Sequence, residues 1–257
     1  MSEQRTNRAW IGTSGWTYES WRADFYAGVP RARWLVHYAR HFDAVEVNAT
    51  FYRTLAPETF AHWREQTPER FRFAIKGTRY ATHVKRLGVD ARVIDRARAP
   101  AVPLGDKLAV VVWQLPARLA RDDARLARFL RRLARWKGPR QAIEFRHPSW
   151  FVPAVERALS NVGIASVLSD SADWPMWDAV TTDTAYARLH GHTATYTSAY
   201  GPRRLAPWAK RARQWLAEGR EVHIYFDNTD VGHAVRDAQA LRALVERDTG
   251  RMRDAVR

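Results

Sequence analysis

Four short apolar segments of this chain become polar at the same point, near the end of each segment: residues 44–48, 141–147, 186–190 and 223–228. A strand buried on both faces normally reads as a continuous run of Val, Ile and Leu. Strand side chains alternate between two faces, so polar residues two positions apart share a face. These pairs are Glu46 and Asn48, Glu144 and Arg146, Arg188 and His190, and Tyr225 and Asp227. Charged side chains are rarely buried unless they are paired or functional, so the strand ends predict where the active site lies.

Strand-like and helix-like segments alternate along the whole chain. Strand-like runs begin near Trp10, Ala44, Phe71, Leu108, Gln141, Gly163, Ala185 and Glu221. Helical patterns cover about 33–42, 57–66, 122–136, 149–159, 203–216 and 231–245, whereas the connections 78–103 and 170–184 have no clear pattern. Eight strands separated by helical connections predict the α/β class and a single (β/α)8 TIM barrel. A doubly wound sheet is the alternative, but residues 12–16 lack its usual glycine-rich phosphate loop.

Length and composition favour one domain over residues 1–257, with a core of about 9–248. The chain has 257 residues, of which 46% are hydrophobic, enough for one large core. No apolar run approaches the roughly 20 residues of a membrane span, and residues 1–8 contain no stretch of signal-peptide type. Cysteine is absent, which excludes disulfides, thiolate catalysis and cysteine-held zinc or iron–sulfur clusters. We therefore expect a cytoplasmic protein with no membrane partner.

The chain is strongly basic, with a net charge of +15. This excess indicates a nucleic acid or another polyanion as a partner. Only five of the 42 basic residues are Lys, so a codon bias toward Arg is the competing explanation. Much of the Arg also lies on predicted helices, as in 121–135, where a solvated face explains it equally well.

Several sequence blocks resemble the domain of unknown function 72 family (YecE-like proteins). The blocks are residues 12–16 with Tyr18, Trp21, Phe25 and Tyr26, residues 45–52, 114–116, 144–147 with Ser149 and Trp150, 188–191, and 226–228. They follow the family's order over about residues 10 to 245. The resemblance implies a (β/α)8 barrel of bacterial or archaeal origin with no established reaction. The chain departs from the family pattern at Asp227, where Asn is usual, and at Ala49, where Ser is usual.

Three residues are the predicted catalytic groups. Glu46 and Glu144 come from strands two and five and are expected to act as an acid–base pair. His190 shares the inward phase of Arg188 and is the expected proton shuttle. The alternative is that both carboxylates only neutralise arginines inside the barrel mouth. His147 is expected to be a structural residue at the start of a helix.

A second group of residues is predicted to bind the substrate. Lys76, Arg146 and Arg188 form the expected anion clamp, because guanidinium forks fit phosphate and carboxylate groups. The remaining predicted substrate-binding residues are Ser14, Trp16, Asn48, Tyr52, Gln114, Asp227 and Asn228. The aromatic members could stack on a base or a sugar ring, or only pack over the rim.

We predict no cofactor and no metal ligands. Glu46, Glu144, Asp170, His190 and Asp227 could together offer oxygen and nitrogen ligands, so a divalent metal stays open as an alternative. Against it, the chain has no short-spaced His motif, and the neighbouring Arg and Lys cations would repel a metal.

These observations predict a hydrolase or lyase that acts on an anionic substrate. The substrate would be a phosphate-bearing sugar, a nucleotide or a nucleic acid. One alternative is a metal-dependent, endonuclease-like phosphodiesterase, and another is a non-catalytic nucleic-acid-binding module. A binding module should carry its basic excess in an external stripe, whereas an enzyme should concentrate polar groups in a deep mouth.

Overall fold

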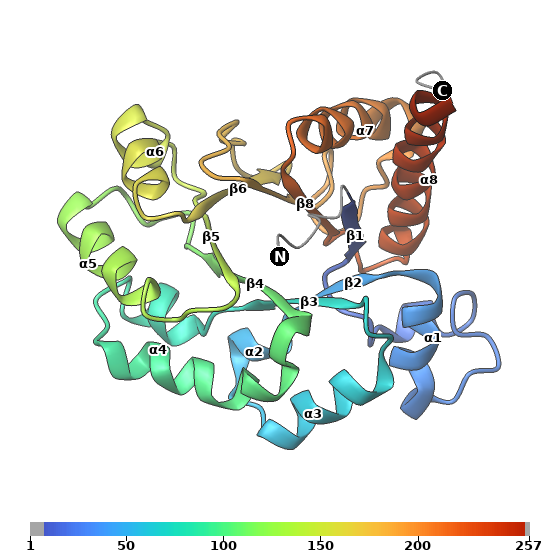
Figure 1. The fold of residues 1–257 in the computed structure, drawn as a ribbon, viewed down its shortest axis with the longest axis horizontal. Coiled ribbons are helices and arrows are strands. Elements are labelled where there is room, and N and C mark those ends of the chain that lie inside the picture. Colours follow the sequence, from blue (N-terminus) through green and yellow to red (C-terminus); the bar gives the residue numbers. More distant parts are fainter. Residues whose placement is uncertain (1–7, 255–257) are drawn as a thin grey trace.

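The computed structural model describes residues 8–254, with the backbone alone over 248–254, and it shows a barrel of eight parallel strands (Figure 1). The strands are β1 (Ala9–Thr13), β2 (Ala44–Val47), β3 (Arg72–Lys76), β4 (Leu108–Gln114), β5 (Arg140–Glu144), β6 (Ala165–Asp170), β7 (Thr184–Leu189) and β8 (Glu221–Phe226). Their order is β1-β8-β7-β6-β5-β4-β3-β2, so strands that are neighbours in sequence also pair in space. The predicted (β/α)8 TIM-barrel fold is confirmed.

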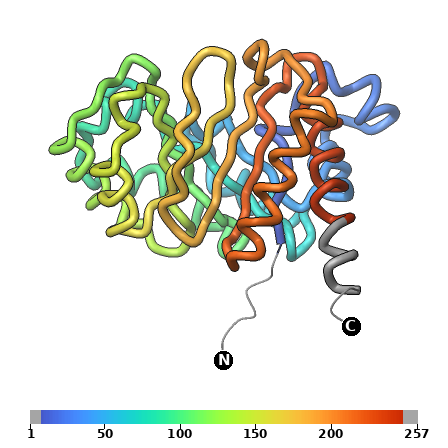
Figure 2. Tube along the Cα trace, turned by 90° about the horizontal axis from the view of Figure 1, so that it is seen from above, coloured from blue at the N-terminus to red at the C-terminus, as the bar shows by residue number. Residues whose placement is uncertain are grey.

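The α-helices surround the strands on the outside of the barrel (Figures 1 and 2). They are α1 (Trp34–His41), α2 (Ala49–Tyr52), α3 (Pro57–Gln66), α4 (Ala91–Arg98), α5 (Asp123–Leu133), α6 (Pro153–Ser160), α7 (Gly201–Ala217) and α8 (His233–Asp254). Shorter helical turns are η1 (Glu19–Trp21), η2 (Arg31–Arg33), η3 (Tyr80–Val84), η4 (Ala99–Lys107) and η5 (Pro148–Trp150). Proline opens α3 and α6, where its missing N–H costs no hydrogen bond.

The connection between β6 and β7, for which the sequence showed no clear pattern, has no helix, so the alternation of strand and helix is interrupted there. Its Trp174-Pro175-Met176-Trp177 sequence disfavours a continuous helix. The helix expected over residues 149–159 was wrong at its start, because Ser149 lies in η5 and α6 begins separately at Pro153.

The barrel closes where β1 meets β2. A parallel bridge joins Ser14 to Glu46, and the Gly15 N–H donates to the Glu46 carbonyl at 2.7 Å. Gly12 makes this approach possible, because a Cβ there would lie 2.1 Å from the Ala44 carbonyl oxygen. The hydroxyl of Tyr38 also ties the two strands, lying 2.9 Å from Thr13 N and 3.1 Å from the Ala44 carbonyl.

Two layers of apolar side chains fill the fold. The inner layer, inside the barrel, consists of Trp10, Ala44, Ala74, Val110, Val112, Ala142, Ala165, Val167, Tyr186 and Tyr225. The larger outer layer packs the opposite strand faces against the helices. Inward side chains two positions further along most strands are polar, and they form the site described below.

Among the described residues, no helix is long and apolar enough to cross a membrane. The prediction that residues 1–8 contain no signal peptide concerns a segment of which residues 1–7 lie outside the described residues.

We expect Gly12→Ala to destabilise the protein by about 1–3 kcal/mol, because the new methyl group would push β1 away from the β2 backbone. Urea unfolding measures this change. Gly88→Ala is the control, because Gly88 is exposed and its added Cβ would lie 3.0 Å from the Lys85 carbonyl oxygen, a much less severe contact than the 2.1 Å at Gly12. Equal stability of the two variants would contradict the proposed close approach.

Candidate functional site

A ring of polar side chains lies inside the barrel at the carboxyl ends of the strands. Each strand, or the residue directly after it, contributes one member: Ser14, Glu46, Lys76, Gln114, Glu144, Ser169, Arg188 and Asp227. All of these side chains are buried. Strand side chains alternate between the inside and the outside of the barrel, and each of these residues continues the inward-facing set of its strand.

Arg188 is the centre of this ring. Its Nε lies 2.9 Å and 3.0 Å from the two carboxylate oxygens of Glu46, and its Nη1 donates to Glu144 at 2.7 Å. Its Nη2 donates to Glu46 at 2.6 Å and to Asp227 at 2.9 Å. Carboxylates from β2, β5 and the end of β8 therefore meet on one guanidinium. This arrangement holds the pKa of Arg188 well above its ordinary value despite complete burial.

Glu46 is enclosed by donors. Besides Arg188, it accepts a hydrogen bond from the Tyr186 hydroxyl at 2.6 Å and another from the Ser14 hydroxyl. Asn48 donates to Ser14 Oγ at 3.0 Å, while its own Oδ1 is buried without a partner among the described residues. Glu46 has no exposed surface, and its carboxylate holds the Arg188 guanidinium in place through contacts to Nε and Nη2.

Glu144 bridges two arginines. It accepts from Arg146 Nε at 2.6 Å, from Arg188 Nη1 at 2.7 Å and from the Ser169 hydroxyl at 3.0 Å. Burial alone would raise the pKa of Glu144, but Arg146 and Arg188 hold it well below the ordinary value. Glu144 is therefore a carboxylate anion over the whole neutral range. Arg146 lies at the edge of the cluster, with its guanidinium 3.6 Å from the ring centre of Trp174.

His190 and Asp227 form the remaining pair of the cluster. His190 Nδ1 lies 3.0 Å from Asp227 Oδ2 without hydrogen-bonding geometry, and His190 Nε2 lies 3.4 Å from Arg188 Nη1. Burial raises the pKa of Asp227, but the charge of Arg188 and the contact with His190 outweigh it and lower the pKa to about 2. An ionised Asp227 therefore lies beside an imidazole, a side chain that often carries protons in catalysis.

Lys76 has the lowest pKa of the cations in the ring. Its Nζ donates to Gln114 Oε1 at 3.1 Å and lies 4.3 Å from the ring centre of Phe51. Burial, and then the positive charge of Arg188, lower the pKa of Lys76 to about 8.

An open cleft of about 440 Å³ adjoins the ring beside Gln114 and Arg146. Its charged and titratable lining consists of Arg79, His83, Arg86, Arg118 and Arg146, with no carboxylate. Burial and the nearby Lys76, Arg79 and Arg146 lower the pKa of His83 to about 4. We call this space the arginine cleft.

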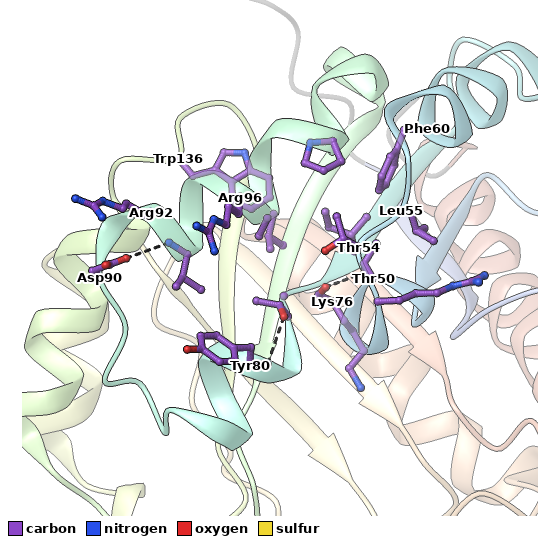
Figure 3. A pocket seen from close by; sticks show the side chains of 18 residues that line it. Thr50, Thr54, Leu55, Phe60, Lys76, Tyr80, Asp90, Arg92, Arg96 and Trp136 are labelled. Carbon is purple, nitrogen blue, oxygen red and sulfur yellow. Dashed lines mark hydrogen bonds between the residues drawn. The ribbon is translucent and has the colours of Figure 1, made fainter.

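A second cavity, of about 520 Å³, lies outside the barrel between the outer faces of β3 and β4 and the helix α4 (Figure 3). Phe60, Ile75, Val93, Val111 and Trp136 give it an apolar floor. Although Lys76 borders this cavity, Figure 3 shows its side chain extending away from Phe60 and Trp136. The cavity is therefore separate from the charged ring.

Several predicted site residues lie away from the ring. Trp16 is buried against Trp63, with ring centres 5.2 Å apart, and Tyr52 is an exposed residue at the end of α2. Asn228 donates to Asp237 of α8 at 2.8 Å. Asp170 contacts His192 at 2.9 Å.

His147 stands at the start of η5, where its Nδ1 accepts from the Ser149 N–H at 3.2 Å.

Ser169, Tyr186 and Trp174 belong to the site but were not predicted from the sequence. On β6 the charged Asp170 was the candidate, but Ser169 has the inward phase that Val167 and Ala165 define. Ser169 donates to Glu144 and accepts from Trp174 Nε1 at 2.9 Å. The period of two could have identified Ser169. Nothing in the sequence links Trp174 to this position.

Within residues 8–247, no group of three or more His, Asp or Glu side chains could hold a metal ion. Glu46, Glu144 and Asp227 do converge, but the guanidinium of Arg188 stands between them. The position that a metal would need is thus taken by a cation of the chain itself.

Comparisons with known proteins identify related chains. The family model described as "Protein of unknown function DUF72" matches residues 10–256. The chain is 31% identical over 171 residues to UPF0759 protein YecE of Escherichia coli K12, covering 63% of this chain and 59% of YecE. It is 24% identical over 241 residues to UPF0759 protein YunF of Bacillus subtilis, covering 81% of this chain and 85% of YunF.

Solved structures share the fold. A DUF72 family protein from Enterococcus faecalis superposes with a TM-score of 0.80 at 20% identity, covering 93% of this chain and 96% of the other. One from Thermotoga maritima gives a TM-score of 0.75 at 25% identity, covering 93% and 100% of the two chains.

We expect Glu46→Gln to destabilise the protein by about 3–5 kcal/mol, because it removes the carboxylate that contacts two nitrogens of the fully buried Arg188. Glu144→Gln should cost less, because Arg188 keeps Glu46 and Asp227 and because Arg146 is partly exposed. Urea unfolding of both variants measures the difference. A larger loss for Glu144→Gln would contradict the central role of Glu46.

The stability contributed by Asp227 should depend on pH. Its pKa is lowered from 3.8 to about 2 in the folded protein, so its contribution is present above pH 4 and is lost as the pH falls toward 2. The lowering corresponds to about 2 kcal/mol. We expect the difference in unfolding free energy between the native protein and Asp227→Asn to shrink between pH 4 and pH 2. A difference independent of pH would contradict the coupling.

Proposed function

The chain belongs to the DUF72 family, and on that premise we propose that it is a hydrolase or lyase acting on a small phosphate-bearing substrate at the barrel mouth. The family carries no assigned reaction, so the proposal rests on the site itself. Barrel enzymes of this architecture place their catalytic groups at the carboxyl ends of the strands, which is where the polar ring of this chain lies.

The observation that carries the proposal is the arginine cleft. Four arginines and no carboxylate line its surface, and Gln114 and Arg146 join it directly to the buried ring. Arg79, Arg86 and Arg118 have no carboxylate partner among the described residues, whereas Arg146 already pairs with Glu144 through its Nε. Such a concentration of cations attracts an anion, and guanidinium groups can bind phosphate through two parallel hydrogen bonds. Arg188, in contrast, directs its donors to Glu46, Glu144 and Asp227. We therefore assign anion binding to Arg79, Arg118 and Arg146.

Proton transfer is assigned to His190. The carboxylate of Asp227 lies beside its imidazole, and His190 is the proposed proton carrier. Glu144 stabilises positive charge beside it, because its low pKa makes it a poor proton donor at neutral pH. Glu46 anchors Arg188 through contacts to its Nε and Nη2. Tyr196, which packs against His190, has a φ of 67°, a strained backbone conformation for a bulky residue and one that recurs at functional sites.

A nucleic acid is the second candidate substrate or partner. The observation that favours it is the exposure of Arg79, Arg86 and Arg118 on the rim of the mouth, together with the net charge of +15. A phosphodiester backbone could lie across this rim. A metal-dependent phosphodiesterase has less support, because the guanidinium of Arg188 stands between the carboxylates of Glu46, Glu144 and Asp227.

We expect inorganic phosphate to bind in the arginine cleft, and Arg118→Gln to weaken that binding about tenfold. A hydrogen bond to a charged group contributes about 1.5 kcal/mol, which corresponds to this factor. Titration calorimetry at low ionic strength measures the affinity. Arg118 is exposed, so its replacement should leave the fold intact.

Arg128→Gln is the matched control, because it removes the same charge from an exposed position on α5 outside the cleft. Equal affinity of the Arg118 and Arg128 variants would overturn the assignment of the cleft. The nucleic-acid candidate would be favoured if duplex DNA binds more tightly than phosphate and if the DNA affinity falls steeply as the salt concentration rises.

A further inference from the structure

The chain buries two lysines in different ways. Lys107 is held between backbone acceptors: its Nζ donates to the carbonyls of Arg64 at 2.8 Å and Thr67 at 2.7 Å. Glu69 lies 3.9 Å away as a counter-charge. These partners give the ammonium of Lys107 a complete structural role.

Lys76 lacks such a set of partners. Within the part of the chain that the structure describes, its Nζ has one hydrogen-bond acceptor, Gln114 Oε1, and no carboxylate within 4.0 Å. A buried ammonium has three protons to place, and one amide oxygen with the face of Phe51 satisfies them incompletely. The neutral amine, which can accept and also react, suits this environment better. The lowering of the Lys76 pKa to about 8 agrees with that geometry.

Lys76 does not line the arginine cleft itself, but its amine lies next to a residue that does. Lys76 continues the inward phase of Ala74 on β3, so its side chain enters the barrel mouth. Its acceptor Gln114 also lines the arginine cleft, so the amine lies one hydrogen bond from the space where an anion would bind. Figure 3 agrees, because the side chain of Lys76 extends away from the cavity outside the barrel.

We propose that Lys76 forms an imine with an aldehyde or ketone whose phosphate or carboxylate group binds in the arginine cleft. This inference rests on the proposed function and selects a lyase over a hydrolase. The neutral amine attacks the carbonyl carbon, and the C–N bond forms as the carbonyl π electrons move to oxygen. The oxygen then leaves as water with the two protons of the amine, and the C=N bond replaces the C=O bond. No oxidant or reductant takes part in this step.

Once protonated, the imine withdraws electrons from the adjacent carbon. This is the activation that cleavage of a neighbouring C–C or C–H bond needs. His190 supplies a proton carrier across the ring for the water that leaves. The substrate class is therefore a small carbonyl compound with an anionic group.

Reductive trapping tests the proposal on the whole chain. The protein is incubated at pH 7.5 with pyridoxal 5′-phosphate, or separately with glycolaldehyde phosphate, and reduced with sodium borohydride. Labelled positions are read by mass spectrometry after cleavage at arginine, which places each of the five lysines in its own peptide. We expect Lys76 to be labelled at least about tenfold faster than the equally buried Lys107, and inorganic phosphate to protect it. The exposed Lys85, Lys137 and Lys210 give the background rate.

Two variants control the experiment. Lys76→Met removes the amine but keeps a side chain of similar length, so labelling above background should disappear while phosphate still binds. Lys137→Arg, at an exposed position, should leave labelling of Lys76 unchanged. Labelling of Lys76 should also rise with a midpoint near pH 8, well below the value of about 10.4 for an exposed lysine.

The outcomes separate the two proposals. If phosphate binds but neither aldehyde labels Lys76 faster than Lys107, the imine is refuted and the anion site stands. If Lys76 is labelled without any protection by phosphate, and phosphate does not bind, the cleft assignment fails and the inference that depends on it fails with it.

Discussion

The fully buried guanidinium of Arg188 is the interaction on which the rest of the site depends. It joins carboxylates from β2, β5 and the end of β8, strands that lie on different sides of the barrel. Burying this many charges is expensive, and such networks rarely add net stability over well-packed apolar residues. What the network does provide is a fixed geometry, because moving any of these strands would leave a charge unpaired inside the protein.

This network also decides which groups remain available for chemistry. Glu144 is held as an anion by Arg146 and Arg188, so it is poorly suited to exchange protons near neutral pH. The oxygens of Glu46 already accept hydrogen bonds from Arg188 and from the Tyr186 hydroxyl. The groups with fewer fixed partners are Lys76, His190 and the outer edge of Arg146. The paired charges around Arg188 thus form a rigid part of the site, and the less fully paired side chains lie around it, as in preorganised electrostatic sites.

The barrel and most of the ring could be predicted from the sequence because both depend on the same local rule. Side chains alternate along a strand, so the strand pattern alone places Glu46, Glu144 and Arg188 inside the mouth. The prediction was wrong on β6, because Asp170 was chosen for its charge although Ser169 has the inward phase of the strand. The rule could not say which cation pairs with which carboxylate, because that choice depends on side-chain conformations across the barrel. The helix-free connection after β6 likewise brings Trp174 onto Arg146 through long-range packing that local pattern does not encode.

The amino-acid usage of the chain indicates that lysine at position 76 has a property that arginine lacks. Only five of 42 basic residues are Lys, so Arg is the usual cation of this protein wherever a positive charge is enough. Arg188 shows that a guanidinium can be buried in this mouth when carboxylates surround it. Position 76 offers an amide and an aromatic face instead, and a guanidinium there could not lose its proton to suit them. An amine can be neutral in the same place. This property separates lysine chemistry from arginine chemistry, and it gives Lys76 a role that none of the chain's arginines can fill.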